Sequence, residues 1–173
     1  SVFPNGTAWM VNDNDVLMVA SLDPVVPMLG NIESHWSRAT AAGNLAEVGA
    51  IEPFDVLSLF AAGPAELARY GAGADVLDVD RMRLEFSSPR EIHNASTGDN
   101  DASFAAITQF DALPELVRSR RERATAAQWR GRADMMAKSD AYSIAYDDYV
   151  RALKLDATDQ PSLNGFTRTA VLT

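Results

Sequence analysis

The chain has 173 residues, 47% of them hydrophobic and 23% charged, which is ordinary for a globular protein of one or two domains. Its net charge of −9 disfavours nucleic acid and an anionic membrane surface as partners, because both attract clustered Lys and Arg. The absence of cysteine excludes disulfides and thiolate metal sites. No apolar run approaches the ~18 residues that span a bilayer.

The chain begins with two short β-like runs, residues 7–11 and 16–21, on either side of the polar cluster Asn12-Asp13-Asn14-Asp15. Polar side chains of this kind support tight turns, so the pattern predicts a β-hairpin. An isolated hairpin is marginally stable in water. We therefore expect these strands to belong to a larger sheet outside this chain, and an open hairpin edge to be covered by a second copy in a homodimer.

The segment after the hairpin is predicted to form three helices, the first beginning at Asp23 and the others covering residues 53–60 and 64–70. Gly43 and Gly49 are expected to interrupt the first helix. One face of that helix carries apolar residues at helical spacing: Leu29, Ile32, Trp36 and Ala39.

A turn-rich polar stretch over residues 87–100 marks a boundary. We accordingly expect a domain over residues 1–90, a linker over 91–99, and a helical domain over 100–173. The fold class is mainly α with a small N-terminal β-hairpin.

The helical domain is predicted to contain a helix that ends near Phe110, a long helix over residues 113–138, and a helical pair over 140–154 and 159–172. Asp159 is the expected cap of the last helix, because a carboxylate there can accept the free backbone N–H groups of the first turn.

The last third of the chain has the spacing of a tetratricopeptide repeat, which is bulky, small, bulky, then Ala, aromatic, Ala and a turn position. These positions are held by Trp129, Ala133, Met136, Ala145, Tyr149, Ala152 and Ala157. One such repeat cannot bury its apolar face alone and normally stacks in arrays. Together with a first residue other than Met, this leads us to expect a piece of a longer protein.

In such arrays the first helix of each repeat lines a concave groove. By spacing, four residues would face that groove: Arg130, Asp134, Ala137 and Lys138. Their alternating charge suits a peptide or a neighbouring domain. The alternative is a helical hairpin that simply packs on the preceding domain.

Other polar residues carry weaker signals. His35 and His93 lack metal-ligand partners at i+3 or i+4, so a structural or solvated role is expected for both. The basic stretch Arg118-Ser119-Arg120-Arg121-Glu122-Arg123 could dock an acidic patch, although a solvated helix face is the simpler interpretation. The Asp147-Asp148 pair is expected to be one exposed turn of a helix.

The first ninety residues resemble the C-terminal end of the membrane-fused, spermidine synthase-like proteins of bacteria. Three stretches carry the resemblance: Val2–Ser21, with its two strands; the Gly-Pro junction in Leu59–Leu67; and the closing segment Asp78–Arg90. Val79 and Met82 depart from the family pattern in the last stretch. Some members of this family carry tetratricopeptide repeats downstream, which fits the second half.

The resemblance implies the edge of a Rossmann-like methyltransferase sheet, taken from an enzyme that transfers an aminopropyl group from decarboxylated S-adenosylmethionine to a diamine. The family's nucleotide loop and catalytic aspartate lie upstream, so we expect this chain to hold no cofactor and to be catalytically silent alone. Asp78, Asp80 and Glu85 would line the polyamine side of the site, with turn and cap chemistry as the alternative reading.

Two functions are therefore expected. The first is the C-terminal fragment of an aminopropyltransferase-like protein, with a helical repeat for protein contact. The alternative is a helical-repeat adaptor with no enzymatic role. The expected partner is a protein, either the upstream domain or another chain, and the expected location is the cytoplasm, with the parent anchored in a membrane through upstream segments.

Overall fold

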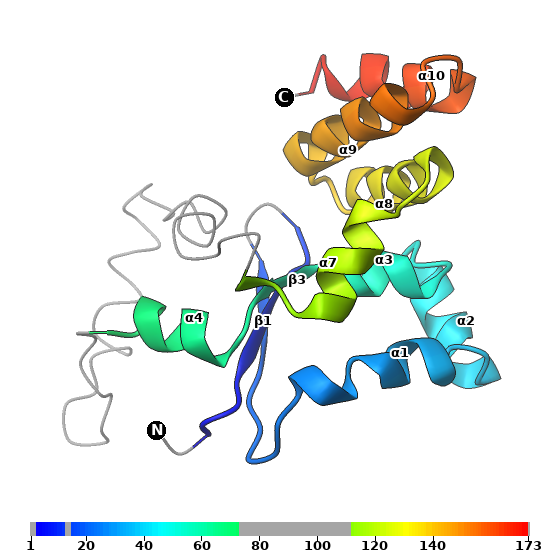
Figure 1. Ribbon diagram of the computed structural model, residues 1–173. Helices are drawn as coiled ribbons and strands as arrows, with labels where there is room; N and C mark the ends of the chain where they lie inside the picture. Colours follow the sequence, from blue (N-terminus) through cyan, green and yellow to red (C-terminus); the bar gives the residue numbers. More distant parts are fainter. Residues whose placement is uncertain (1–2, 13–14, 73–111, 173) are drawn as a thin grey trace, which may run out of the picture.

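The computed structural model describes residues 3–12, 15–72 and 112–172. Within these ranges the chain is mainly helical, with one three-stranded antiparallel sheet of strand order β2-β1-β3. Figure 1 shows the sheet beside a body of helices, from which α8, α9 and α10 rise as a stack. The predicted mainly α class with an N-terminal hairpin is confirmed.

Strands β1 (Thr7–Met10) and β2 (Val16–Val19) form the predicted hairpin. Asn12 and Asp15 close its turn: the Asp15 backbone N–H donates to Asn12 Oδ1 at 2.6 Å, and Asn12 Nδ2 donates to Asp15 Oδ2 at 2.7 Å. β1 is buried throughout, whereas β2 is mostly exposed. The hairpin therefore contributes one core strand and one edge strand.

The prediction of a helix over residues 53–60 is wrong at its end, because α3 (Pro53–Leu57) stops early and β3 (Phe60–Ala62) follows. β3 pairs with β1, and the Phe60 ring packs edge-on against Trp9 at 5.2 Å between centroids. This chain therefore supplies a third strand, β3, on the β1 side of the hairpin. Among the described residues, the outer edge of β2 has no strand beside it.

The region between the hairpin and α3 forms short pieces in place of the predicted single helix. These are a 3₁₀ turn (Val26–Met28), α1 (Gly30–Ser34) and α2 (Ala39–Glu47). Gly49, with a φ of 94°, ends the segment as expected. Gly43 lies inside α2, so the predicted break there is wrong.

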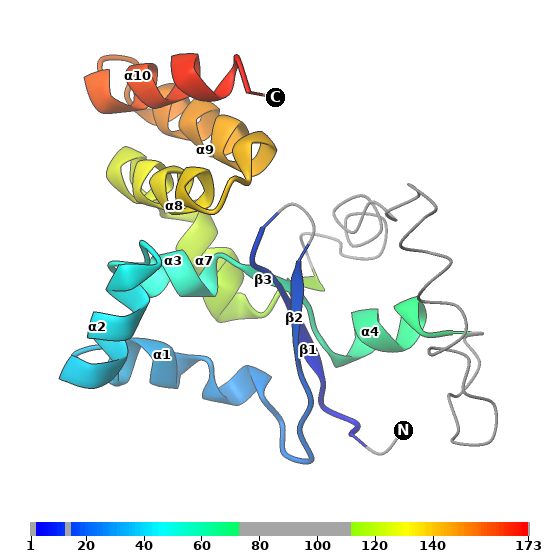
Figure 2. The same cartoon turned by 180° about the vertical axis from the view of Figure 1, so that it is seen from behind.

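Helix α4 (Pro64–Tyr70) begins at the predicted Gly63-Pro64 junction. The Gly63 backbone N–H donates to Glu66 Oε2 at 3.0 Å, which satisfies a donor at the start of the helix. The junction therefore turns the chain directly from β3 into a helix (Figure 2).

The predicted long helix over residues 113–138 is two helices, α7 (Glu115–Glu122) and α8 (Ala126–Lys138). Thr125 starts α8 with a capping box: its Oγ1 accepts from the Gln128 backbone N–H at 3.3 Å, and Gln128 Oε1 accepts from the Thr125 N–H at 3.0 Å. The capping box at Thr125 therefore begins a new helix, although the apolar periodicity of the sequence continues through this position.

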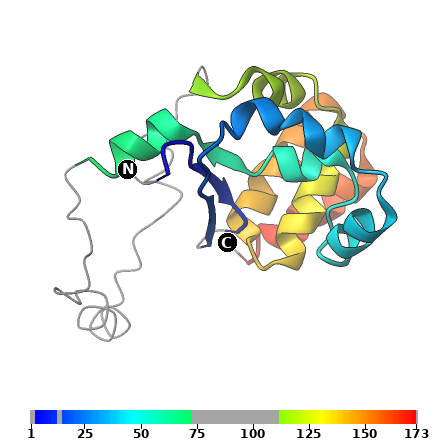
Figure 3. The ribbon, with the colours of Figure 1, turned by 90° about the horizontal axis from the view of Figure 1, so that it is seen from below.

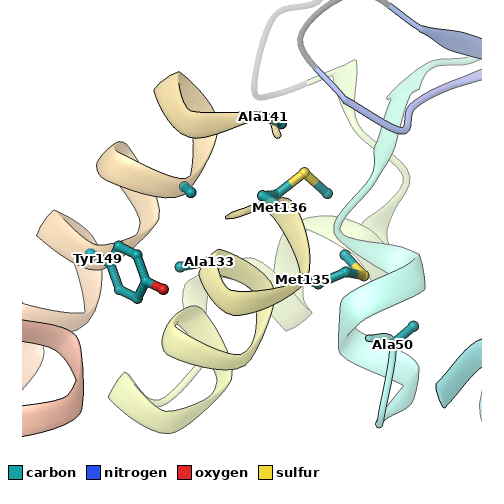
Figure 4. Close-up of a cluster of buried hydrophobic side chains, with 7 residues drawn as sticks. Ala50, Ala133, Met135, Met136, Ala141 and Tyr149 are labelled. Atoms are coloured by element: carbon teal, nitrogen blue, oxygen red, sulfur yellow. The ribbon is translucent and has the colours of Figure 1, made fainter. Parts of the chain in front are cut away.

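Helices α9 (Tyr142–Leu155) and α10 (Gln160–Thr169) match the predicted pair, with Asp159 at the N-cap position of α10. The predicted capping bond is wrong, because the Asp159 carboxylate accepts from Arg130 Nη1 and from the Ser162 hydroxyl and makes no cap bond to the backbone. α8 and α9 form an antiparallel hairpin, and α10 packs on α9 (Figure 1). Figure 4 shows Tyr149 of α9 against Ala133 of α8, and Met135 on the side of α8 that faces the neighbouring segment; Met135 and Ala50 belong to the same buried cluster. This cluster of buried side chains therefore joins the stack of α8, α9 and α10 to the segment that precedes α3.

A second cluster joins the sheet to the first helix after the boundary. Trp9, Leu57 and Phe60 pack with Leu113 and Val117, which precede and begin α7. Figure 3 shows α1, α3, α7 and α8 gathered beside the strands. Segments from both predicted domains share these cores, and the predicted linker 91–99 lies outside the described residues.

Candidate functional site

The predicted polyamine-side residues Asp78, Asp80 and Glu85 lie outside the described residues, as does His93. His35 is exposed at the C-terminal end of α1. Among the described residues, no group of three or more His, Asp or Glu could hold a metal ion.

Three of the four predicted groove residues on α8 have a side-chain partner inside the chain. Arg130 Nη1 donates to Asp159 Oδ1 at 2.6 Å, and Asp134 Oδ1 accepts from the Tyr149 hydroxyl at 2.6 Å. Lys138 Nζ donates to the backbone carbonyl of Glu47. These contacts tie α8 to α10, to α9 and to the end of α2, and a groove role for the three residues stays a prediction.

The expectation that Asp147-Asp148 forms an exposed turn is wrong for Asp148, which is fully buried. Asp148 Oδ2 accepts from Arg132 of α8, and Asp148 Oδ1 accepts from Arg151 Nη1 at 3.1 Å. Asp147 remains exposed. One buried carboxylate therefore holds two guanidinium groups, one from each helix of the hairpin.

The basic stretch of α7 is also only partly a solvated face. Arg118 pairs with Glu115 as expected, and Arg120 makes a two-pronged contact with Glu33 at 2.5 and 2.8 Å. Arg121 is half-buried, and its Nη2 donates to the backbone carbonyls of Ser58 at 2.6 Å and Phe60 at 2.9 Å. Arg121 thereby fastens α7 to the turn between α3 and β3.

These residues surround a half-open pocket of about 300 Å³ between the end of β1, the turn before β3, and helices α7, α8 and α9. We call it the arginine pocket. It is lined by Met10, Ser58, Leu59, Phe60, Ala61, Arg121, Trp129, Arg132, Ser143, Ile144, Asp147, Asp148 and Arg151.

Three arginines line the pocket, and the Trp129 ring contacts two of them, Arg132 and Arg151. The guanidinium carbon of Arg151 lies 4.9 Å from the centre of the indole ring, and that of Arg132 lies 6.0 Å from it, both within cation–π range. The indole is itself fixed by an edge-on contact with Phe54 at 5.2 Å between centroids. The arginine pair is thus held between an aromatic face and Asp148.

Charge in the arginine pocket is unbalanced toward the positive. Burial, followed by repulsion from Arg132 and Arg151, lowers the pKa of Arg121 to about 10. Burial raises the pKa of the Asp148 carboxyl, while the two arginines act in the opposite direction. The three guanidinium groups therefore destabilise one another, and a single buried carboxylate offsets only part of their charge.

Two buried side-chain polar atoms have no hydrogen-bond partner among the described residues: Arg132 Nε and Asp55 Oδ1. Asp55 lies on α3, and its other oxygen accepts from the backbone N–H groups of Ile51 at 2.8 Å and Glu52 at 3.0 Å. Unpaired buried polar atoms cost about 1–3 kcal/mol each. Such atoms are therefore rare in folded proteins.

The sequence carries a signal for the buried Arg132–Asp148 pair of this pocket, in addition to the motifs described above. Helix α8 repeats buried positions at Trp129, Arg132, Ala133 and Met136, and α9 repeats them at Ala145, Asp148, Tyr149 and Ala152. Three residues after the first of these positions, α8 carries the positively charged Arg132 and α9 carries the negatively charged Asp148. A charge on an otherwise apolar face indicates a buried pair.

No family model matches the chain, and neither does any curated protein or any solved structure. In the described part of the chain, no helix is both long and apolar enough to cross a membrane.

Proposed function

We propose that this chain is a protein-contact module built on a tetratricopeptide-type helical hairpin, and that it forms the C-terminal part of a spermidine synthase-like protein. The observation that carries the first part is a repeat in the stack. The N-cap residues of α8 and α10 are Thr125 and Asp159, which stand 159 − 125 = 34 residues apart. Tetratricopeptide repeats have a period of 34 residues.

Burial of the signature positions supports the same proposal. Six of the seven are buried between the helices: Trp129, Ala133, Met136, Ala145, Tyr149 and Ala152. Ala157, at the turn position, is exposed between α9 and α10. The small residues allow close helix approach and the large ones fill the space between, as in stacked helical repeats.

Exposed apolar side chains at the end of the stack supply a contact surface. Leu155 ends α9, Leu163 lies on α10, and Val171 and Leu172 follow α10, with Val171 83% exposed. Stacked repeats bury such a face against the next element. The occupant we propose is a protein, either another part of the parent or a separate chain.

The β2 edge supports self-association as a second contact. Leu17 and Met18 point to opposite faces of the strand, and both are more than half exposed. A hydrophobic strand edge is a template for pairing with another chain. Two copies joined along β2 would extend the sheet from three strands to six.

A quantitative capture experiment tests the contact proposal. The purified chain is used as bait in a lysate of its source cells, beside a Leu163→Lys/Val171→Lys variant and an Asn164→Lys control on the same helix. Proteins that bind the wild type and the control, but not the double variant, support the proposal. Identical captured sets for all three baits would refute a role for this surface.

The spermidine synthase-like parent is supported by the hairpin and by α4, which begins at the Gly63-Pro64 junction. We propose that the chain alone neither transfers an aminopropyl group nor holds a cofactor. We also propose that it contacts no nucleic acid or membrane. The proposed location is the cytoplasm, with the parent protein anchored in a membrane through upstream segments. An assay with decarboxylated S-adenosylmethionine and putrescine should give no spermidine. Detectable spermidine would contradict the silent part of this proposal.

A further inference from the structure

The arginine pocket has features that neither a helical repeat nor a contact surface requires. Arg121, Arg132 and Arg151 reach it from three different helices, in a chain whose net charge is −9. Like charges brought together in a partly buried space repel one another strongly. Such a cluster is stabilised when an anion occupies the space between its members.

The donors of the pocket are only partly used inside the chain. Each guanidinium carries five N–H groups. The hydrogen bonds described above use Nη2 of Arg121, Nη1 of Arg132 and Nη1 of Arg151. Arg132, whose side chain is 9% exposed, also keeps Nε without an acceptor among the described residues.

The arginines are held in place before any ligand arrives. Arg132 and Arg151 lie on the Trp129 ring and share Asp148, while Arg121 is fixed to two backbone carbonyls. A preorganised site loses less side-chain entropy on binding. The planar guanidinium fork matches the oxygens of phosphate and carboxylate groups.

We propose that the arginine pocket binds the phosphate group of a small molecule through Arg121, Arg132 and Arg151. The number of donors decides for phosphate over carboxylate, because guanidinium groups from three helices can meet the three terminal oxygens of a phosphate group, whereas a carboxylate has two. The three guanidinium groups, Asp148 and the exposed Asp147 at the rim leave the lining with an excess of one positive charge. Asp147 opposes the binding of an anion. The ~300 Å³ of the pocket is at the lower end of the range for small-ligand sites.

The test is a titration of the purified chain with inorganic phosphate, at constant ionic strength and at pH 8, followed by calorimetry and by the NMR signals of the arginine Nε–Hε groups. A dissociation constant of about 1 mM or tighter is expected, since two charge-assisted hydrogen bonds suffice for it. The Arg132 Nε–Hε signal should shift, and acetate should bind at least about tenfold more weakly, because it offers fewer acceptor oxygens to the three guanidinium groups.

Three variants separate the pocket from general charge effects. Arg151→Gln removes a half-exposed donor and should weaken phosphate binding about tenfold. Asp147→Asn removes the opposing rim charge and should tighten it. Arg123→Gln removes a positive charge from the exposed end of α7, outside the pocket lining, and should change nothing. Three results would each overturn the proposal: no phosphate binding up to about 10 mM, equal weakening of phosphate binding by Arg123→Gln and Arg151→Gln, or acetate binding as tight as phosphate binding.

Discussion

Replacing Gly165 with alanine should destabilise the stack, although it replaces a poor helix former by the best one. Gly165 is buried in α10 and faces the Tyr149 ring of α9. A Cβ atom at Gly165 would overlap Tyr149 Cζ and Cε1, and it would lie 2.7 Å from Cε2, closer than the 3.0 Å that real Cβ atoms keep. The ring cannot withdraw easily, because Tyr149 is fully buried and its hydroxyl donates to Asp134 at 2.6 Å.

Two opposing effects set the size of the loss. Alanine gains about 1 kcal/mol over glycine in a helix interior. Overpacking a well-packed contact costs about 1–3 kcal/mol, and more when the neighbour cannot move. Since three ring atoms are involved, α10 must shift away from α9, and the upper end applies. We expect Gly165→Ala to lower the free energy of unfolding by about 2 kcal/mol net.

Urea unfolding followed by circular dichroism measures this difference. Gly43→Ala is the matched control: Gly43 lies inside α2 with no atom within 4 Å of its would-be Cβ, so the substitution should stabilise by about 1 kcal/mol. Adding Tyr149→Leu to Gly165→Ala should relieve the overlap, making the double variant less destabilised than the sum of the single changes. A Gly165→Ala protein as stable as the Gly43→Ala protein would refute the close contact between α9 and α10.

Three further predictions follow from the charges and the strand edge. Asp148→Asn leaves Arg132 as an uncompensated buried charge and should cost about 3–5 kcal/mol in urea unfolding, whereas Asp147→Asn should stay within about 0.5 kcal/mol of wild type. Burial raises the pKa of Asp55 above 3.8, so the Asp55 carboxyl binds a proton more tightly in the folded protein than in the unfolded chain. The free energy of unfolding of the wild type, relative to that of Asp55→Asn, should therefore fall as the pH rises from 3.8 through the raised pKa. A difference that does not change with pH would contradict this. Met18→Lys should abolish concentration-dependent self-association in sedimentation velocity while Asn164→Lys retains it, and a wild type that stays monomeric at every concentration would refute pairing along β2.

The elements that the sequence predicted well depend on neighbouring residues. The hairpin follows from two apolar runs around a polar turn, and α9 and α10 follow from helical periodicity with Asp159 at the cap. Thr125 and Gln128 form a capping box that was visible in the sequence. The apolar periodicity that runs through it concealed the end of α7 and led to one helix being predicted in place of two.

The elements that the sequence did not predict depend on distant residues. The apolar run that ends α3 suits a helix or a strand, and only pairing with β1, some fifty residues earlier, makes Phe60–Ala62 a strand. Asp148 looked like half of an exposed pair, because its partner Arg132 lies 16 residues away on another helix. The arginine pocket needs three helices and the strands β1 and β3 to meet, so no local pattern contains it.

The most direct test of the proposed contact function is site-specific photo-crosslinking in cells. A photoreactive amino acid is placed at Val171, on the exposed apolar end of the stack, and in a second protein at Asn164, an exposed polar position on α10. The account predicts a discrete protein adduct from position 171 and none from position 164. No adduct from position 171, or the same adducts from both positions, would contradict the claim that this surface binds a protein.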